Sequence, residues 1–141
     1  MFENFKKIDE IRAIRPNISI TTDIIVGFPG ETESMFNETL KSAKKVNFSK
    51  IHVFPYSSRT GTKAALMIDQ VSDVEKKRRV HELISLTDEQ EKNYYNLFVG
   101  KELLVLIEEV YEDRSVGHTS NYLSVTIPKK LEKNNIYSFK L

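Results

Sequence analysis

Apolar residues recur with a helical period at the start of this 141-residue chain. From residue 2 to residue 15, apolar side chains stand three or four positions apart with charged residues between them, and Pro16 follows. This spacing predicts an amphipathic helix that ends before the proline. A second helix is predicted from Glu33 to Lys45, with Thr32 as its N-cap. Its expected inward side chains are Met35, Phe36, Leu40, Ala43 and Val46.

Two runs of β-branched and apolar residues are predicted to be strands. Residues 18–26 are β-branched almost throughout, and residues 49–54 form the next such run. The order helix, strand, helix, strand with short connections is typical of α/β units around a parallel sheet. Because parallel sheets are buried on both faces and normally have several strands, we expect this part to belong to a larger α/β domain.

The pattern changes from helical to β near Leu97. One long helix is predicted from Val71 to about Asn96, with the basic block 75–79 mostly outward. Its expected inward side chains are Val74, Val80 (or Lys77), Leu83, Ile84 and Leu86. Short strands are predicted at 103–107, 122–127 and 136–139, separated by 113–115, Gly117 and 128–135. We therefore predict an α/β domain over residues 1–96 and an all-β domain, a small OB-like β-barrel, over residues 97–141.

Composition excludes several kinds of chemistry. The formal charge is +1, so there is no strong basic excess to attract nucleic acid. Cysteine is absent, which removes disulfides, thiolate nucleophiles, Cys-ligated zinc and ordinary iron–sulfur ligation. The three histidines are scattered, so we predict no metal site. No apolar run approaches the ~20 residues that cross a bilayer, and no signal peptide is visible, so we predict a cytoplasmic protein without a membrane partner.

The first candidate binding segment is the turn after the first strand, Gly27-Phe-Pro-Gly30. Glycines at the exit of a buried strand let the chain turn sharply and let a ligand approach the main chain. Ligands of α/β domains also bind at the carboxyl ends of the strands. The alternative is a tight turn that binds nothing. The pattern lacks the Gly and Lys-Ser/Thr spacing of a phosphate loop.

The second candidate is the loop after the second strand, which should emerge beside the first turn. Phe54 and Tyr56 offer ring surface to a flat base, and Arg59 suits a carboxylate. The alternative is a surface loop with a buried aromatic anchor.

The third candidate is a polar turn in the all-β region, made of His118, Thr119, Ser120, Asn121 and Tyr122. Its hydroxyl and amide groups suit phosphate or a 2′-OH, and its aromatic ring suits an unpaired base. In the next loop, Lys129, Lys130 and Lys133, together with the basic block of the long helix, would add phosphate contacts. The alternative is that Ser120 and Asn121 cap the turn while Tyr122 enters the barrel core.

Four sequence elements, in this order, carry a family resemblance. They are residues 21–32, residues 53–65 with Phe-Pro-Tyr-Ser and Gly-Thr-x-Ala, Gln70-Val71 before the Lys/Arg-rich helix, and residues 117–125. Together they resemble the radical-S-adenosylmethionine tRNA methylthiotransferases, whose terminal TRAM domain has a turn like residues 117–125. The resemblance runs from about Ile8 to Ile127. It is nearest to the subgroup that modifies threonylcarbamoyladenosine beside the tRNA anticodon.

The resemblance implies a partial radical-SAM barrel, its last strands and helices, followed by a TRAM RNA-binding domain. It implies that residues 22–31 help to seat S-adenosylmethionine, with Ile25 and Gly27 near the adenine, and that residues 53–56 add main-chain contacts. The cofactor-binding residues expected in full are Asp23, Ile25, Gly27, Phe54, Pro55, Tyr56 and Arg59. The family also uses two 4Fe-4S clusters, whose cysteines lie upstream of these motifs. This chain is therefore expected to hold no cofactor cluster and to be inactive alone.

The leading hypothesis is a C-terminal fragment of such an enzyme that keeps tRNA docking and part of the S-adenosylmethionine rim. Its expected partners are tRNA and the missing N-terminal portion of the same enzyme. A partial barrel should expose apolar edges, so self-association is also expected. A second hypothesis is a stand-alone, non-catalytic RNA-binding module. A third is an unrelated α/β ligand-binding domain without RNA contact.

Overall fold

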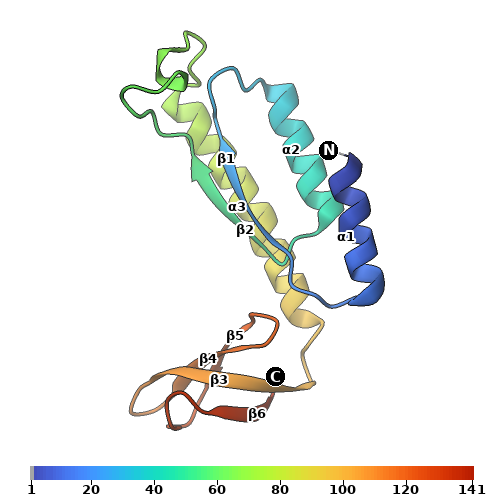
Figure 1. Ribbon diagram of the computed structural model, residues 1–141. Helices are drawn as coiled ribbons and strands as arrows, with labels where there is room; N and C mark the ends of the chain where they lie inside the picture. Colours follow the sequence, from blue (N-terminus) through green and yellow to red (C-terminus); the bar gives the residue numbers. More distant parts are fainter. Residues whose placement is uncertain (1) are drawn as a thin grey trace.

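The computed structural model describes residues 2–141, with side chains from Phe5 onward, and shows two parts joined by one long helix (Figure 1). The first part has α1 (Phe2–Ile14), β1 (Thr21–Val26), α2 (Glu33–Val46) and β2 (Lys50–Pro55). A short 3₁₀ turn, η1 (Ala64–Leu66), leads into α3 (Asp73–Asn96). The second part has β3 (Glu102–Val110), β4 (Ser115–Thr119), β5 (Ser124–Ile127) and β6 (Ile136–Lys140).

The N-cap predicted for α2 forms as expected, and α3 begins at Asp73 with an N-cap of the same kind that was not predicted from the sequence. The Thr32 side chain accepts a hydrogen bond from the Met35 backbone N–H at 3.3 Å and so begins α2. Ser72 does the same for α3, accepting from the Glu75 N–H at 3.2 Å. Asn47 ends α2 in a left-handed conformation with φ 54°, which asparagine tolerates better than most residues.

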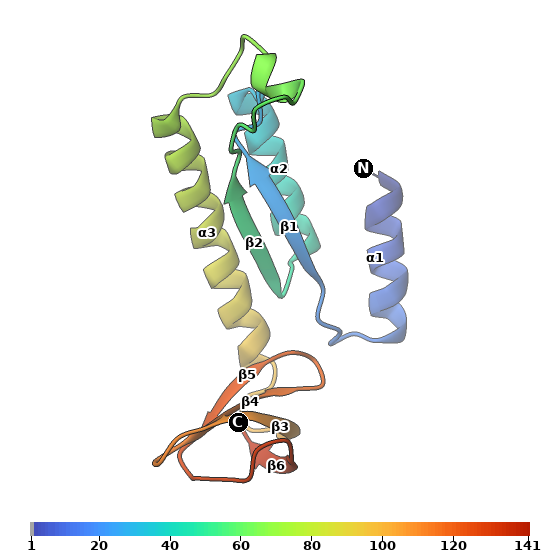
Figure 2. The same ribbon diagram turned by 60° about the vertical axis from the view of Figure 1, so that its left-hand side comes forward.

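The sheet of the α/β part has two parallel strands, and helices cover one of its faces (Figure 2). Thr21 pairs with Lys50 at one end of the sheet, and Val26 pairs with Pro55 at the other. The covered face forms a core with α2 and α3, comprising Val26, Phe36, Leu40, Ala43, Ile51, Leu83 and Leu86. The other face is open, as the exposed alternate positions of both strands show.

The second part is a four-stranded antiparallel sheet in the order β5-β4-β3-β6. It has its own core of Val105, Ile107, Val125 and Ile127. The pairing leaves β5 and β6 as two edges, so the structure confirms an all-β part with an antiparallel sheet but not a closed barrel. No helix among residues 2–141 is long and apolar enough to span a membrane.

The strand β4 differs from the sequence expectation. The pattern predicts turns over Ser115 to Thr119, with Gly117 as a break, whereas these residues form a strand. Gly117 lies inside β4 opposite Ile107. Glycine suits this position because a Cβ there would meet the Leu106 carbonyl of β3. The pairing of β3 with β4 shifts between Ile107 and Glu109, which is a β-bulge at Glu108.

The predicted inward sides of the helices are partly wrong. Met35 of α2 and Val74 of α3 are exposed, and Ile84 is 40% exposed. Leu83 and Leu86 are buried as predicted, and three polar residues share the buried side of α3 with them: Arg79, Thr87 and Gln90. The Thr87 hydroxyl accepts from the Ile51 N–H at 2.8 Å, and the Gln90 amide donates to the Ala43 carbonyl at 2.9 Å. These bonds fasten α3 to β2 and α2.

Candidate functional site

The open face of the β1–β2 sheet brings three of the predicted cofactor-binding residues together. Ile25 of β1 pairs in register with Phe54 of β2, and both are about half exposed. Asp23, also exposed, is opposite His52 one step along the same face. An apolar pair beside a carboxylate suits a flat heterocycle that carries hydroxyl or amino groups.

Gly27, Pro55 and Tyr56 lie together at the carboxyl end of this sheet. The Tyr56 backbone N–H donates to the Val26 carbonyl at 2.8 Å, so the two turns leave the sheet side by side. The Tyr56 ring meets Phe28 edge-on at 5.2 Å between centroids, and its hydroxyl is buried without a hydrogen-bond partner among the described residues. Arg59 lies farther along the loop with an exposed side chain, in a turn where Thr62 bonds to its carbonyl.

The turn after β1 is held from behind by a buried arginine of α3. The Arg79 side chain is 5% exposed and donates to both the carbonyl and the carboxylate of Glu31, at 3.0 and 2.5 Å. The same Glu31 carboxylate accepts the Gly27 N–H at 2.9 Å. Since Gly27 has φ 74° and a Cβ would meet the Lys76 side chain, a side chain at this position would be strained and crowded. The clamp therefore fixes the main chain that is expected to bind the cofactor.

A second arginine extends this cluster toward solvent. Arg78 pairs with Glu33, Glu75 and Glu82 at 2.6, 2.5 and 2.9 Å. Hydrogen bonding to Arg78, and then to Arg79, lowers the pKa of Glu75 from 4.5 to about 2. The same contact with Glu75 raises the pKa of Arg78. Glu75 and Arg78 therefore both stay ionised at neutral pH.

The polar turn of the β part lies at the opposite end of α3. Thr119 is buried, and its hydroxyl accepts from the Leu123 N–H at 3.0 Å and donates to the Asn121 side chain at 2.6 Å. The Asn121 amide donates to the Tyr94 hydroxyl at 3.1 Å, and that hydroxyl donates to the Asn17 carbonyl at 2.9 Å. Thr119 and Asn121 therefore hold the turn and tie it to the α/β part.

His118 and Tyr122 present aromatic surface from the same hairpin. His118 lies in β4 rather than in the turn, and its ring centroid is 5.5 Å from that of Tyr122. Its Nδ1 lies 2.5 Å from Oε2 of Glu108, the residue in the β-bulge. Tyr122 is 80% exposed, so the alternative that it enters the core is wrong. Ser120 beside it is also exposed.

Lys129 and Lys130 do not join this turn. They are exposed and follow β5, whereas the turn precedes it, so the four-residue strand separates the two groups. The Lys129 carbonyl accepts from the buried Ser115 hydroxyl at 2.8 Å, which fixes the lysine loop against the start of β4. A ligand that contacts both groups must extend along the hairpin.

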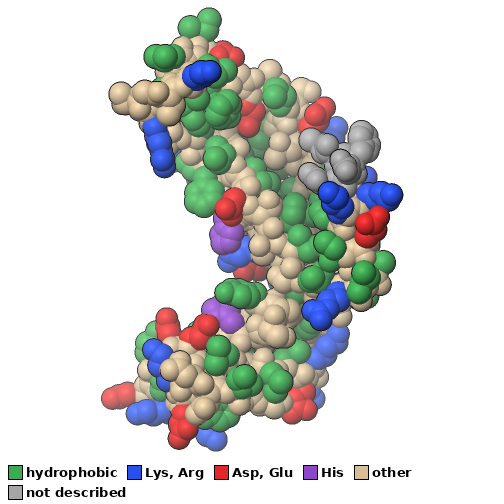
Figure 3. Space-filling model, in the orientation of Figure 1, with side chains coloured by type: hydrophobic (Ala, Val, Ile, Leu, Met, Phe, Trp, Pro, Cys, Tyr) green, Lys and Arg blue, Asp and Glu red, His purple; other side chains and the backbone are tan. Residues whose placement is uncertain are grey.

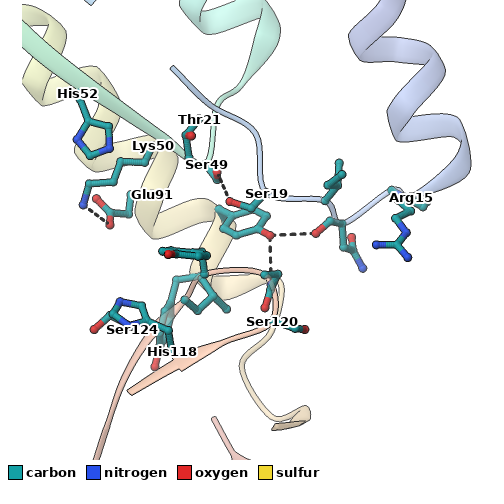
Figure 4. A pocket seen from close by; sticks show the side chains of 18 of the residues that line it. Arg15, Ser19, Thr21, Ser49, Lys50, His52, Glu91, His118, Ser120 and Ser124 are labelled. Atoms are coloured by element: carbon teal, nitrogen blue, oxygen red, sulfur yellow. Dashed lines mark hydrogen bonds and ion pairs between the residues drawn. The ribbon is translucent and has the colours of Figure 1, made fainter. Parts of the chain in front are cut away.

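A cleft of about 1080 Å³ separates the polar turn from the amino end of the β1–β2 sheet. Figure 3 shows this hollow between the two parts of the molecule. Figure 4 shows His52 and Lys50 on one side and His118 and Ser120 on the other. Arg15 lies at the outer edge of the cleft, and Lys50 pairs with Glu91 of α3 at 3.1 Å. The sequence pattern predicts neither the cleft nor a role for Arg15, Lys50 or His52 in it.

Known proteins are similar to this chain over most of its length. The threonylcarbamoyladenosine tRNA methylthiotransferase of Bacillus subtilis is 44% identical over 124 residues, which is 84% of this chain and 28% of the relative. The corresponding protein of Thermotoga maritima is 45% identical over 101 residues, 72% of this chain and 23% of the relative. A tRNA-2-methylthio-N(6)-dimethylallyladenosine synthase of Lachnoclostridium phytofermentans is 41% identical over 138 residues, 95% of this chain and 30% of the relative. The chain belongs to the tRNA methylthiotransferase family.

This family membership agrees with the resemblance found in the sequence. No family model matches the chain. The chain spans less than a third of the length of the methylthiotransferases it matches. Because the Lachnoclostridium synthase matches 95% of the chain, the similarity takes in the turn after β1, α3 and most of the β part.

Several residues at these sites cannot be identified from the local sequence pattern, because their partners are far away in sequence. The helical pattern assigns Arg79 outward with its basic neighbours, but its partner Glu31 is 48 residues away in sequence. The Tyr94 hydroxyl meets Asn17 and Asn121 at separations of 77 and 27 residues. A local pattern cannot identify such partners. The one available signal is polarity at Thr87 and Gln90, positions that the helical period assigns to the buried side.

Proposed function

We propose that this chain forms part of a tRNA methylthiotransferase, in which residues 97–141 dock tRNA as a TRAM domain. Residues 1–96 would then contribute the last strands of a radical-SAM barrel. The observation that carries the proposal is 44% identity to the Bacillus subtilis methylthiotransferase over 84% of the chain. Because its proposed substrate is tRNA, we expect the enzyme to act in the cytoplasm.

S-adenosylmethionine would lie against the open sheet face and its carboxyl edge. Ile25 and Phe54 would pack on the adenine, and Asp23 would accept from hydroxyl or amino groups. The main chain at Gly27, Pro55 and Tyr56 would bound the same ligand, while Arg59 would approach only from the loop. When bound beside a cluster, S-adenosylmethionine supplies the radical and the methyl group. The Tyr56 hydroxyl, which has no hydrogen-bond partner in the described part of the chain, fits a site that a polar ligand completes.

The iron–sulfur clusters of the family do not fit the residues present. Such clusters need thiolate ligands, and the sequence has no cysteine. Residues 2–141 likewise contain no group of three or more His, Asp or Glu side chains that could hold a metal ion. The ligands would therefore have to come from the rest of the enzyme, the second expected partner. We expect no cluster-dependent reaction from this chain alone.

For tRNA docking, His118, Ser120 and Tyr122 would contact nucleotides directly, while Thr119 and Asn121 hold their turn. Lys129 and Lys130 would bind phosphates farther along the hairpin. Phosphate contacts of this kind give an affinity that falls with salt. We therefore expect the chain to shift unmodified tRNA in gels at low salt.

The tRNA-binding test uses a double variant. Lys129→Ala with Lys130→Ala should weaken tRNA binding and lower the slope of log K against log salt by roughly 0.7 to 0.9 for each phosphate that is no longer neutralised. Lys41→Ala, an exposed lysine on α2, serves as the matched control. A folded chain that leaves tRNA unshifted at low salt contradicts tRNA docking.

The substrate we propose for the whole enzyme is threonylcarbamoyladenosine in tRNA. Two of the relatives above carry this substrate in their names, although synthases acting on dimethylallyladenosine have similar identities of 41–48%. Mass spectrometry of tRNA nucleosides from cells that lack the gene distinguishes the two substrates. Loss of the methylthio group from threonylcarbamoyladenosine alone supports the proposal, whereas loss from dimethylallyladenosine contradicts it.

A further inference from the structure

We propose that the cleft between the two parts binds an unpaired stretch of RNA, with one base on Tyr122 and its phosphates near Arg15 and Lys50. The inference rests on the proposed tRNA docking and states where and in which form the RNA binds. It makes the docking site composite, because the ring comes from the β part and the cations come from the α/β part. The sequence pattern assigns these residues no common role.

The Tyr122 ring is exposed to solvent and available for stacking. A large aromatic side chain that is 80% exposed gains little from burial, and its backbone has φ 65°, a conformation that L residues rarely adopt. Both features work against stability, yet the turn enforces them, because the Tyr122 N–H donates to the Thr119 carbonyl at 2.9 Å. His118 backs the ring at 5.5 Å with a tilt of 38°. Such a fixed, solvent-facing ring is suited to a base that has left its own stack.

The charges that line the cleft favour phosphate. Arg15 and Lys50 bring two fixed positive charges, and Glu91 is the one carboxylate among the described lining residues. Lys50 forms an ion pair with Glu91 at 3.1 Å. Because both side chains are about half exposed, the Lys50 ammonium group can still reach a phosphate. Ser120 and Ser124, both exposed on the facing hairpin, offer hydroxyls to the 2′-OH.

The size and construction of the cleft fit a short single strand. A volume of about 1080 Å³ exceeds the roughly 300–1,000 Å³ typical of small-molecule sites, so there is room for more than one nucleotide. The Asn17–Tyr94–Asn121 chain of hydrogen bonds joins its two sides at the back. Paired RNA offers no free base face to the ring, which is why we infer an unpaired segment.

The experiment measures binding of a labelled six-nucleotide oligoribonucleotide by fluorescence anisotropy at low salt. Tyr122→Gly removes the ring and relieves the left-handed backbone, so we expect affinity to fall roughly five- to 150-fold with an unchanged or higher melting temperature. Lys50→Ala and Arg15→Ala should each weaken binding about threefold or more and reduce its salt dependence. Tyr111→Ala and Lys41→Ala, an exposed tyrosine and lysine outside the cleft lining, should bind as the unchanged chain does.

Competition experiments test whether the cleft prefers an unpaired RNA strand to free nucleotides and to paired RNA. Unlabelled tRNA should displace the oligonucleotide, whereas free AMP and an RNA duplex should not do so at comparable concentrations. If AMP competes as well as tRNA, the cleft binds free nucleotides rather than a strand. If the duplex competes as well as tRNA, the cleft does not select unpaired RNA. Either result overturns the inference. If tRNA binds but the three cleft variants bind it and the oligonucleotide normally, the inference fails while tRNA docking stands. If tRNA does not bind at all, the proposed function fails first.

Discussion

At the scale of single residues, a glycine allows two strands of the β part to pair closely. Gly117 stands in β4 where a Cβ would meet the Leu106 carbonyl and the Ile107 Cα of β3. The close approach coincides with the bulge at Glu108, whose carboxylate is thereby aimed at His118. The position of His118 beside Tyr122 thus depends on a glycine in the middle of a strand.

We predict that Gly117→Ala destabilises the β part by about 1 to 3 kcal/mol, because the added methyl group overlaps main-chain atoms that have no room to move away. Thermal or urea unfolding measures the change. Gly61→Asn is the control, since nothing lies within 4 Å of that position and asparagine tolerates its φ of 84°. Equal stability of the two variants would show that the close contact of β3 with β4 does not matter.

At the scale of elements, α3 organises the molecule through polar groups. Near its start, Arg79 clamps the turn after β1; in the middle, Thr87 and Gln90 bond to main-chain groups of β2 and of α2; near its end, Tyr94 bonds to Asn121. At ~1.5 Å per residue its 24 residues span about 36 Å, so it also separates the two candidate sites. The residues proposed to contact the cofactor and the polar turn therefore lie at opposite ends of one helix.

We predict an acid-sensitive contribution from Glu75 at the start of this helix. The folded-state pKa is lowered to about 2 by Arg78 and Arg79, so the stabilisation is fully present above about pH 4.5 and is lost as the pH falls through 2. Denaturant unfolding between pH 2 and pH 6 should therefore show a smaller acid-induced loss in Glu75→Gln than in the unchanged chain. Parallel pH profiles would mean that these ion pairs do not contribute.

At the scale of the whole molecule, no helix or strand of residues 2–141 covers the open face of the β1–β2 sheet. Ile25 is 57% and Phe54 49% exposed, side by side on a surface that parallel sheets normally bury. Figure 3 shows the hollow that continues from this part toward the β part. Such a surface favours association of chains when the rest of the sheet is absent.

We predict concentration-dependent self-association through this face, measured by sedimentation velocity. Ile25→Lys should shift the chain toward monomer, because an ammonium group resists burial between apolar surfaces. The comparison variant is Ile68→Ser, which removes a fully exposed isoleucine elsewhere. A monomer at all concentrations, or equal effects of both variants, would count against association at this face.

The sequence alone determined the elements whose signals are local. Helical periods, the cap at Thr32 and the β-branched run of β1 depend on contacts within a few residues, so α2, α3 and the parallel pairing could be predicted from them. The lack of cysteine excluded thiolate-held clusters without any structure. The motifs around residues 21–32 and 53–65 likewise indicated the family.

Only the tertiary structure decided which side chains are buried, which are exposed and which meet. Arg79 looks like part of a solvated basic block until Glu31, far away in sequence, provides a buried partner. The sequence of β4 lacks the apolar–polar alternation that predicts a strand, because the residue at its centre is a glycine that allows close contact with β3. The Asn121 amide is bonded to Tyr94 of α3, a contact that exists only after both parts have folded, and Tyr122 beside it stays exposed. Burial and long-range hydrogen bonds are properties of the assembled chain, so the cleft and its composite lining could not be predicted from the sequence alone.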